Sequence, residues 1–107
     1  MLRTISKTIT VATVAETLAD IIVGGAGYRR TIVGIYFETI ANVHARVYLN
    51  NDRILEVSGD IITDAVQPIP IDHELADGDT ISAGFYNGTG GSVTHDLSVV
   101  VREEPAN

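Results

Sequence analysis

Polar and apolar side chains alternate with a period of two along most of this chain, and Gly, Asn and Asp interrupt the alternation at short intervals. Such alternation predicts half-buried β-strands joined by turns. We predict eight strands, at residues 4–11, 15–23, 30–40, 43–49, 53–58, 66–71, 80–87 and 93–103. Residues 12–22 also fit a short helix with Val14, Leu18 and Ile21 on one face, but their β-branched content favours a strand.

The same alternation predicts which side chains face the core. The inward positions that we predict are Ile5, Ile9 and Val11, then Val43, Ala45, Val47 and Leu49, then Ile81, Ala83 and Phe85, and finally Val93, Leu97, Val99 and Val101. Residues 30–40 differ because both faces are apolar, with Val33, Ile35 and Phe37 on one face and Ile32 and Tyr36 on the other. A strand of this kind is covered on both sides, by the fold or by a partner.

The spacing of the turns predicts the fold class. Short strands with turns about every 8–12 residues indicate an all-β sandwich or barrel. Asn50-Asn51-Asp52 is a hairpin signal, because Asn and Asp tolerate the left-handed backbone of tight turns. It joins the fourth and fifth predicted strands, which is typical of a jelly roll. We therefore predict an eight-stranded antiparallel β-sandwich of the jelly-roll type; an immunoglobulin-like sandwich is the alternative if one strand is miscounted.

Composition narrows the function classes. The 107 residues form one domain, residues 1–107, with a short polar tail at 104–107 that we expect to be loose. The absence of cysteine excludes disulfides and cysteine-based metal sites. A net charge of −7 repels phosphate backbones, so we expect no nucleic-acid partner. The apolar runs are too short for a membrane span, and the first residues lack the pattern of a signal peptide.

The densest group of charges lies at residues 72–79, with Asp72, Glu74, Asp77 and Asp79. Carboxylates could hold calcium, but their spacing does not match a calcium-binding loop. Ala76-Asp77-Gly78-Asp79 is typical of a turn, with Leu75 in the core just before it. We interpret the stretch as a structural corner. Pro68 and Pro70 cannot donate ladder hydrogen bonds, so the preceding strand is predicted to lie at a sheet edge.

No catalytic constellation is visible in the sequence. His44, His73 and His95 lie far apart and lack the helical spacing of a zinc site, although a composite site across strands is an alternative. No serine lies in a nucleophile elbow, and the glycines at 24–27 lack a phosphate-binding pattern. Asn87-Gly88-Thr89 matches a glycosylation acceptor, but Asn-Gly is itself a turn dipeptide. We expect a chain that is not an enzyme, with no catalytic residue, metal site or cofactor.

Tyr28-Arg29-Arg30 is the one compact cationic group. It could contact an acidic partner surface, because Arg and Tyr are enriched at interfaces. The alternative is that these arginines balance neighbouring carboxylates of their own chain.

Residues 31–103 contain the strand TIVGIYFETI, the hairpin ARVYLNNDRILEV, the segment PIPIDHELADGDTISAGFYNGTG and the closing strand LSVVVREE. In these segments the chain resembles small jelly-roll structural proteins of tailed phages and related viruses, which include capsid decoration, or cement, proteins. The pattern Leu-x-x-Gly-Asp-x-Ile, followed by a strand that ends in Asn, also recurs in receptor-binding and carbohydrate-binding jelly rolls.

The resemblance implies a virion structural protein, assembled in the host cytoplasm, that binds the major capsid protein on the outside of the capsid as a homotrimer, with no nucleic acid and no membrane. An N-terminal arm, residues 1–7, would reach across a neighbouring subunit. The candidate partner-contact residues are Arg3, Ile5, Tyr28, Arg29, Arg30, Ile32, Tyr36, Ile61 and Ile62. The alternative function is a carbohydrate- or receptor-binding module, which would need exposed aromatic rings for stacking on sugars.

Overall fold

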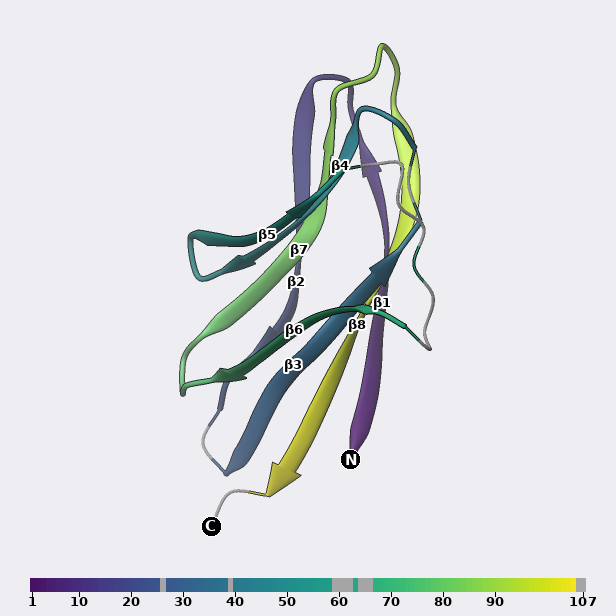
Figure 1. The fold of residues 1–107 in the computed structure, drawn as a ribbon. Helices are drawn as coiled ribbons and strands as arrows, with labels where there is room; N and C mark the ends of the chain where they lie inside the picture. Colours follow the sequence, from purple (N-terminus) through teal and green to yellow (C-terminus); the bar gives the residue numbers. More distant parts are fainter. Residues whose placement is uncertain (26, 39, 59–62, 64–66, 106–107) are drawn as a thin grey trace.

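The computed structural model describes residues 1–25, 27–38, 40–58, 63 and 67–105. These residues form eight β-strands and no helix (Figure 1). The strands are β1 (Leu2–Val11), β2 (Ala15–Val23), β3 (Tyr28–Phe37), β4 (Val43–Leu49), β5 (Asp52–Val57), β6 (Ile69–Leu75), β7 (Thr80–Asn87) and β8 (Val93–Pro105). The strand interpretation of residues 15–22 is therefore correct, and the helical alternative is wrong.

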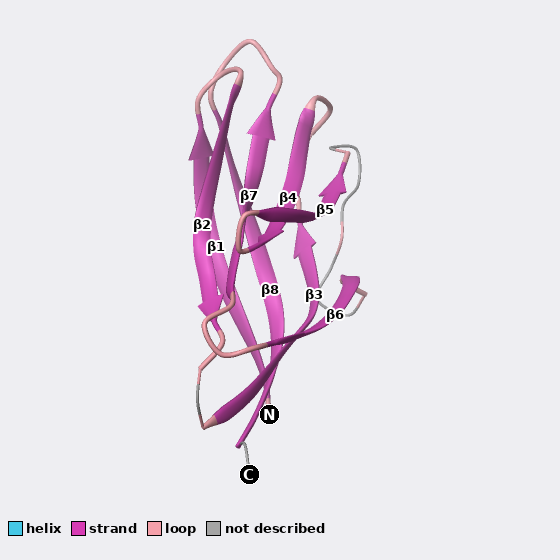
Figure 2. Ribbon diagram, turned by 90° about the vertical axis from the view of Figure 1, so that its left-hand side faces the viewer, coloured by secondary structure: helices cyan, strands magenta, loops and turns pink. Residues whose placement is uncertain are grey.

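The strands form two antiparallel sheets of four that pack face to face (Figure 2). The strand order is β1-β8-β3-β6 in one sheet and β2-β7-β4-β5 in the other. β4 and β5 are consecutive strands of one sheet, whereas every other pair of consecutive strands lies in different sheets. This is the order of a jelly roll, so the predicted eight-stranded jelly-roll sandwich is confirmed.

The predicted hairpin closes between β4 and β5. Leu49 pairs with Asp52, and Asn50 adopts a φ of 56°, which Asn tolerates better than most residues. The Asn50 amide donates to the Thr80 carbonyl oxygen at 2.8 Å, and the Asn50 side chain accepts from the Thr80 amide at 3.1 Å. These bonds fix the hairpin against the start of β7.

The core consists of inward-facing aliphatic side chains around an edge-to-face pair, Phe37 and Phe85, whose ring centroids are 6.5 Å apart. The inward faces predicted for β4 and β7 are confirmed, and β1 and β8 also present the predicted residues to the core. Burial of these side chains supplies most of the driving force for folding.

The predicted faces of β3 are wrong for Ile32. The pairing with β8 slips by one residue between Ile32 and Gly34, which leaves Val33 as an extra, bulged residue. Because a bulge shifts the two-residue alternation, Ile32 lies on the same inward face as Ile35 and Phe37, and it is 0% exposed. Ile32 therefore cannot contact a partner in this fold, although we predicted that it would.

β6 also differs from its prediction, because it begins at Ile69 and continues to Leu75. The first half of the acidic stretch thus belongs to a strand, and only residues 76–79 form the turn. Asp72 has a φ of 52°, and the register against β3 shifts at this point. The predicted edge position is confirmed, because β6 is the outer strand of its sheet.

The first and last strands belong to one sheet. Leu2 pairs with Arg102, so the proposed N-terminal arm forms the first part of β1 along β8 in this structure. Glu104 and Pro105, which we placed in a tail, extend β8 and pair with Arg29 and Tyr28 of β3. The remainder of the predicted tail lies outside the described residues.

We predict that Gly84→Ala destabilises the fold by about 1–3 kcal/mol, the usual cost of overpacking. A Cβ on Gly84 would overlap the carbonyl oxygen of Thr17 on β2, so β2 would have to move away from β7. Gly90→Ala is the matched control, because a Cβ there meets no described atom within 4 Å. Urea unfolding measures both variants, and an equal stability of the two would show that β2 is free to shift.

Candidate functional site

The predicted arginines gather at one end of the sandwich. We call it the basal end, where β1 and β3 begin and β8 ends (Figure 1). Arg30 Nε lies 2.7 Å from Glu103 Oε2, and Arg3 Nη2 lies 3.6 Å from the same oxygen. Arg29 Nε lies 3.5 Å from Glu74 Oε1. All three arginines therefore balance carboxylates of their own chain, which is the alternative kept open for Arg29 and Arg30.

Glu103 lies at the centre of this charged group. Its side chain follows the inward-facing Val99 and Val101 along β8 and is 12% exposed. The hydrogen bond from Arg30 lowers the pKa of Glu103 below its ordinary value of 4.5, and desolvation offsets only part of that effect. The positive charges of Arg3 and the N-terminus act in the same direction as Arg30.

Apolar side chains are exposed beside these charges. Met1, Leu2, Val23 and Tyr28 are half of the eight large hydrophobic side chains that are exposed in the described part of the chain. The Arg30 guanidinium lies 5.5 Å from the centre of the Tyr28 ring, and Arg30 Nη1 donates to the Val23 carbonyl oxygen at 2.8 Å. The basal end thus combines exposed apolar surface with arginines, a composition that is enriched at protein interfaces.

The other predicted contact residues do not form one surface. Ile5 is half-buried against the core from β1, and Ile32 is fully buried. Tyr36 is half-buried on β3, near the opposite end from Tyr28. Ile61 and Ile62 lie outside the described residues.

The outer face of the second sheet carries a charged network that sequence reasoning missed. Arg46 on β4 bonds to Glu16 on β2 at 2.8 Å and to Glu56 on β5 at 2.6 Å, and its guanidinium lies 4.7 Å from the centre of the Tyr86 ring. Desolvation alone would lower the pKa of Arg46, but the bonds to both carboxylates outweigh it and raise that pKa. The bond to Glu16 likewise raises the pKa of Tyr48. These side chains meet only when the sheet forms, and they stabilise its outer face.

The acidic corner has a structural role. The Asp79 carboxylate accepts from the Ala76 amide at 2.9 Å and from the Asn50 side chain at 3.2 Å, and these bonds lower the pKa of Asp79. Gly78 has a φ of 89°, as the predicted turn requires. Among the described residues no group of three or more His, Asp or Glu side chains is placed to hold a metal ion.

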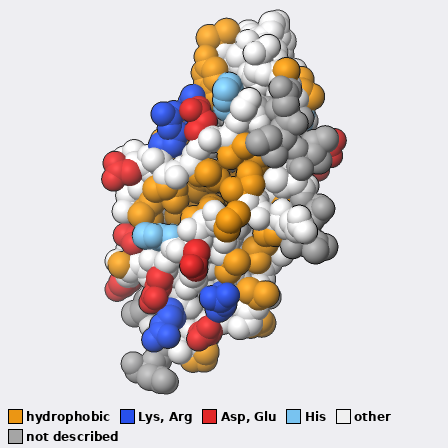
Figure 3. All heavy atoms as spheres, viewed as in Figure 1, with side chains coloured by type: hydrophobic (Ala, Val, Ile, Leu, Met, Phe, Trp, Pro, Cys, Tyr) orange, Lys and Arg blue, Asp and Glu red, His pale blue; other side chains and the backbone are white. Residues whose placement is uncertain are grey.

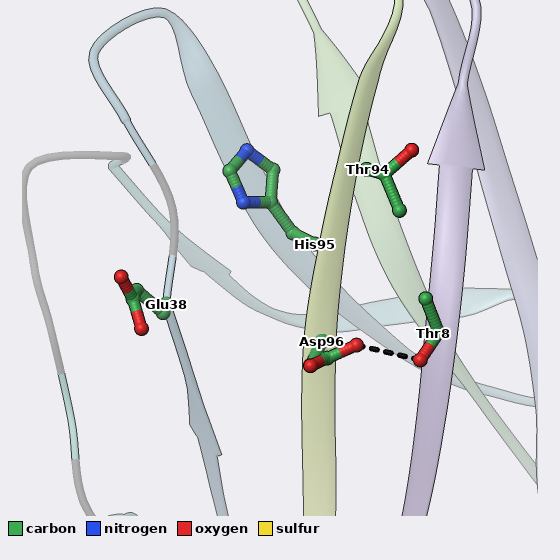
Figure 4. Close-up of a pocket in the computed structure, with 5 residues that line it drawn as sticks. All are labelled: Thr8, Glu38, Thr94, His95 and Asp96. Atoms are coloured by element: carbon green, nitrogen blue, oxygen red, sulfur yellow. Dashed lines mark hydrogen bonds between the residues drawn. The ribbon is translucent and has the colours of Figure 1, made fainter.

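A hollow of about 520 Å³ lies beside β8, near the end opposite the basal end. The hollow opens beyond Phe37, the last residue of β3, because β3 and β8 are no longer paired past this residue. Its lining contains Thr8 of β1, Thr94, His95 and Asp96 of β8, and Glu38, which follows β3 (Figure 4). A second hollow of about 180 Å³ shares the lining residues Glu38 and Asp96 with the first, and we call these two neighbouring hollows the groove.

His95 and Asp96 point to opposite sides of β8, as the alternation predicts (Figure 4). Asp96 accepts a hydrogen bond of 2.6 Å from the Thr8 hydroxyl. His95 packs against Phe85 with 5.7 Å between ring centroids, and its Nε2 is shielded from solvent without a hydrogen-bond partner in the described structure. This groove could not be predicted from the sequence, because Thr8, Glu38 and Asp96 come from three distant segments.

Asn87 is a further residue whose role the sequence did not reveal. It ends β7 and is 0% exposed. Its side chain donates to the carbonyl oxygens of Val11 at 3.1 Å and Gly91 at 2.7 Å, and it accepts from the Thr89 amide at 2.9 Å. The side chain that matched a glycosylation acceptor is thus a buried connector of the loops at the end opposite the basal end.

Comparison with protein-family models, with curated proteins and with solved structures gave no match to this chain. Among the described residues, no helix is long and apolar enough to span a membrane.

Lowering the pH should destabilise the protein partly through Glu103. The pKa of Glu103 is lower in the folded chain than its ordinary value of 4.5. Its contribution to the free energy of unfolding is therefore fully present above pH 4.5, and it is lost as the pH falls from 4.5 through the folded pKa. We expect Glu103→Gln to be less stable at pH 7 and to lose less stability than the wild type between about pH 5 and pH 3. Urea unfolding at several pH values measures this. Glu104→Gln, at the exposed next position, is the control, and parallel curves for wild type and Glu103→Gln would contradict the assignment.

Asn87→Ala should lower the free energy of unfolding by about 2–3 kcal/mol, because it leaves buried backbone groups without partners. Asn51→Ala, in the exposed β4–β5 turn, should change it by less than about 0.5 kcal/mol. Thermal unfolding of the two variants side by side checks this difference. A cost for Asn87→Ala no larger than that of the control would show that water replaces the amide.

Proposed function

We propose that this chain is a non-enzymatic structural protein of a virion, which binds the outer surface of the capsid and stabilises or decorates it. Its partner is the major capsid protein, and it acts as a homotrimer in a virion assembled in the host cytoplasm. The observation that carries the proposal is the jelly-roll strand order, because it is the architecture of the proteins that residues 31–103 resemble. Since one fold hosts many functions, the surfaces must supply the rest of the support.

The basal end supports a contact with the capsid. Met1, Leu2, Val23 and Tyr28 are exposed there beside arginines that are already paired with carboxylates. Exposed apolar side chains at the rim of a sheet lose unfavourable contact with water when a partner covers them. Paired arginines can join such an interface without leaving a buried, unbalanced charge.

The open edge of the sandwich supports self-association. Hydrophobic side chains gather between the levels of β5 and β6 on the face shown in Figure 3. Leu55 and Val57 of β5 and Ile69 and Ile71 of β6 are only partly buried against the core, and Ile54 is exposed. β5 and β6 are edge strands of the two sheets, so a neighbouring copy could cover both without disturbing either sheet.

The homotrimer predicts a particle three times the 11.4 kDa of one chain in multi-angle light scattering at micromolar concentration. Ile54→Glu should dissociate it, because the charge would be buried at the open edge. Val14→Glu, an exposed apolar side chain in the β1–β2 turn, should leave the trimer intact. A monomeric wild type, or a trimer that tolerates Ile54→Glu, would rule out this interface.

Capsid binding is tested by co-sedimentation with shells assembled from the major capsid protein of the same virus without this chain. We expect the wild type to sediment with the shells, and Leu2→Glu with Tyr28→Ala to weaken binding at least about tenfold, as loss of an interface anchor does. Val14→Ala should bind as the wild type does. If the wild type stays in the supernatant, the proposed function fails.

A further inference from the structure

The groove beside β8 has a chemical character that the proposed function does not use. Two carboxylates, Glu38 and Asp96, line it with the hydroxyls of Thr8 and Thr94 and the imidazole of His95. No lysine or arginine is among its described lining residues. A site of this charge repels phosphate and carboxylate ligands, and it offers several acceptors to a ligand that donates hydrogen bonds.

The hydroxyl groups are held in position by cross-strand hydrogen bonds. Thr8 Oγ1 donates to Asp96 at 2.6 Å, and the hydroxyl oxygens of Thr10 and Thr94 lie 2.9 Å apart. Below them, the Ser6 and Ser98 hydroxyl oxygens lie 2.7 Å apart. Because β1 and β8 form these pairs in register, the wall of the groove is preorganised for a ligand.

Two further features of the groove match a sugar ring. Tyr36 lines its smaller hollow, where an aromatic face can stack on the apolar C–H face of a sugar. His95 lines the larger hollow, and its Nε2 lacks a hydrogen-bond partner in the described structure. Because Nε2 is shielded from solvent where the ring packs on Phe85, it is the rest of the His95 ring that can contact a ligand in the larger hollow.

We infer that this groove binds a neutral saccharide of one or two rings. The larger hollow, about 520 Å³, lies within the usual size range of small-ligand pockets. An ammonium or guanidinium group of a protein partner would suit the two carboxylates and could also lie over the Tyr36 ring, but it offers no acceptor to the threonine hydroxyls. The saccharide can use the carboxylates, the hydroxyls and the tyrosine together.

The test is a titration of the ¹⁵N-labelled chain followed by NMR. The probes are glucose, galactose, mannose and N-acetylglucosamine with their disaccharides, and cadaverine as a cationic probe. We expect at least one sugar to shift the amide signals of Thr8, Asp96 and Ser98, with a dissociation constant in the millimolar range, about 4 kcal/mol of binding free energy. No shift with any sugar at saturating concentration, or shifts confined to other residues, would overturn the proposal. A response to cadaverine alone at these amides would assign the groove to a cationic group instead.

Variants connect the signal to the groove. Asp96→Asn and Glu38→Gln should each weaken sugar binding roughly tenfold, the effect of losing one charge-assisted hydrogen bond. Asp77→Asn, at an exposed turn position outside the groove, should bind as the wild type does. Unfolding curves establish that each variant is folded. An unchanged affinity for the sugar in both Asp96→Asn and Glu38→Gln would contradict the proposal. Capsid binding uses the basal end, so the two proposals can fail independently.

Discussion

The pairing of the first strand with the last is the contact on which the rest of this fold depends. β1 runs along β8 from Leu2 opposite Arg102 to Val11 opposite Val93. β8 also pairs with β3, so Val99 and Val101 become fully buried only when strands from both ends of the chain have met. Contacts between such distant segments must overcome a large loop-closure entropy before they contribute stability. The core, the basal end and the groove beside β8 therefore exist only in the completed sandwich.

The alternation of side chains was sufficient to predict the fold class and most of the core, because a half-buried strand has a strict two-residue period. It failed where the backbone departs from that period. The bulge at Val33 moved Ile32 to the inside, and the irregular register near Asp72 carried β6 into a stretch that looked like a loop. Bulges are set by how neighbouring strands fit together, so the sequence of a single strand does not reveal them.

Charged clusters in the sequence were poor guides to the surface for a related reason. Residues 72–79 looked most suited to chemistry, yet Asp79 caps its own turn and Glu74 pairs with Arg29. The groove draws on Thr8, Glu38 and Asp96, which only the strand order brings together. Likewise, Arg46 meets Glu16 and Glu56 across three strands of one sheet. Sites made by strand pairing carry no local signature, whereas turns do.

The start of β1 and the end of β8 lie at the basal end, and the backbone groups of Met1 and Glu103 are hydrogen-bonded to each other at 2.8 Å and 2.9 Å (Figure 1). A short linker could therefore join them, and the chain could be reopened in a connection at the far end, such as the glycine-rich one between β7 and β8. In such a circular permutant β1 and β8 would become neighbours in sequence. The most distant contact of the fold would turn into a local hairpin, and the order in which the sandwich assembles could be changed without altering a single core side chain.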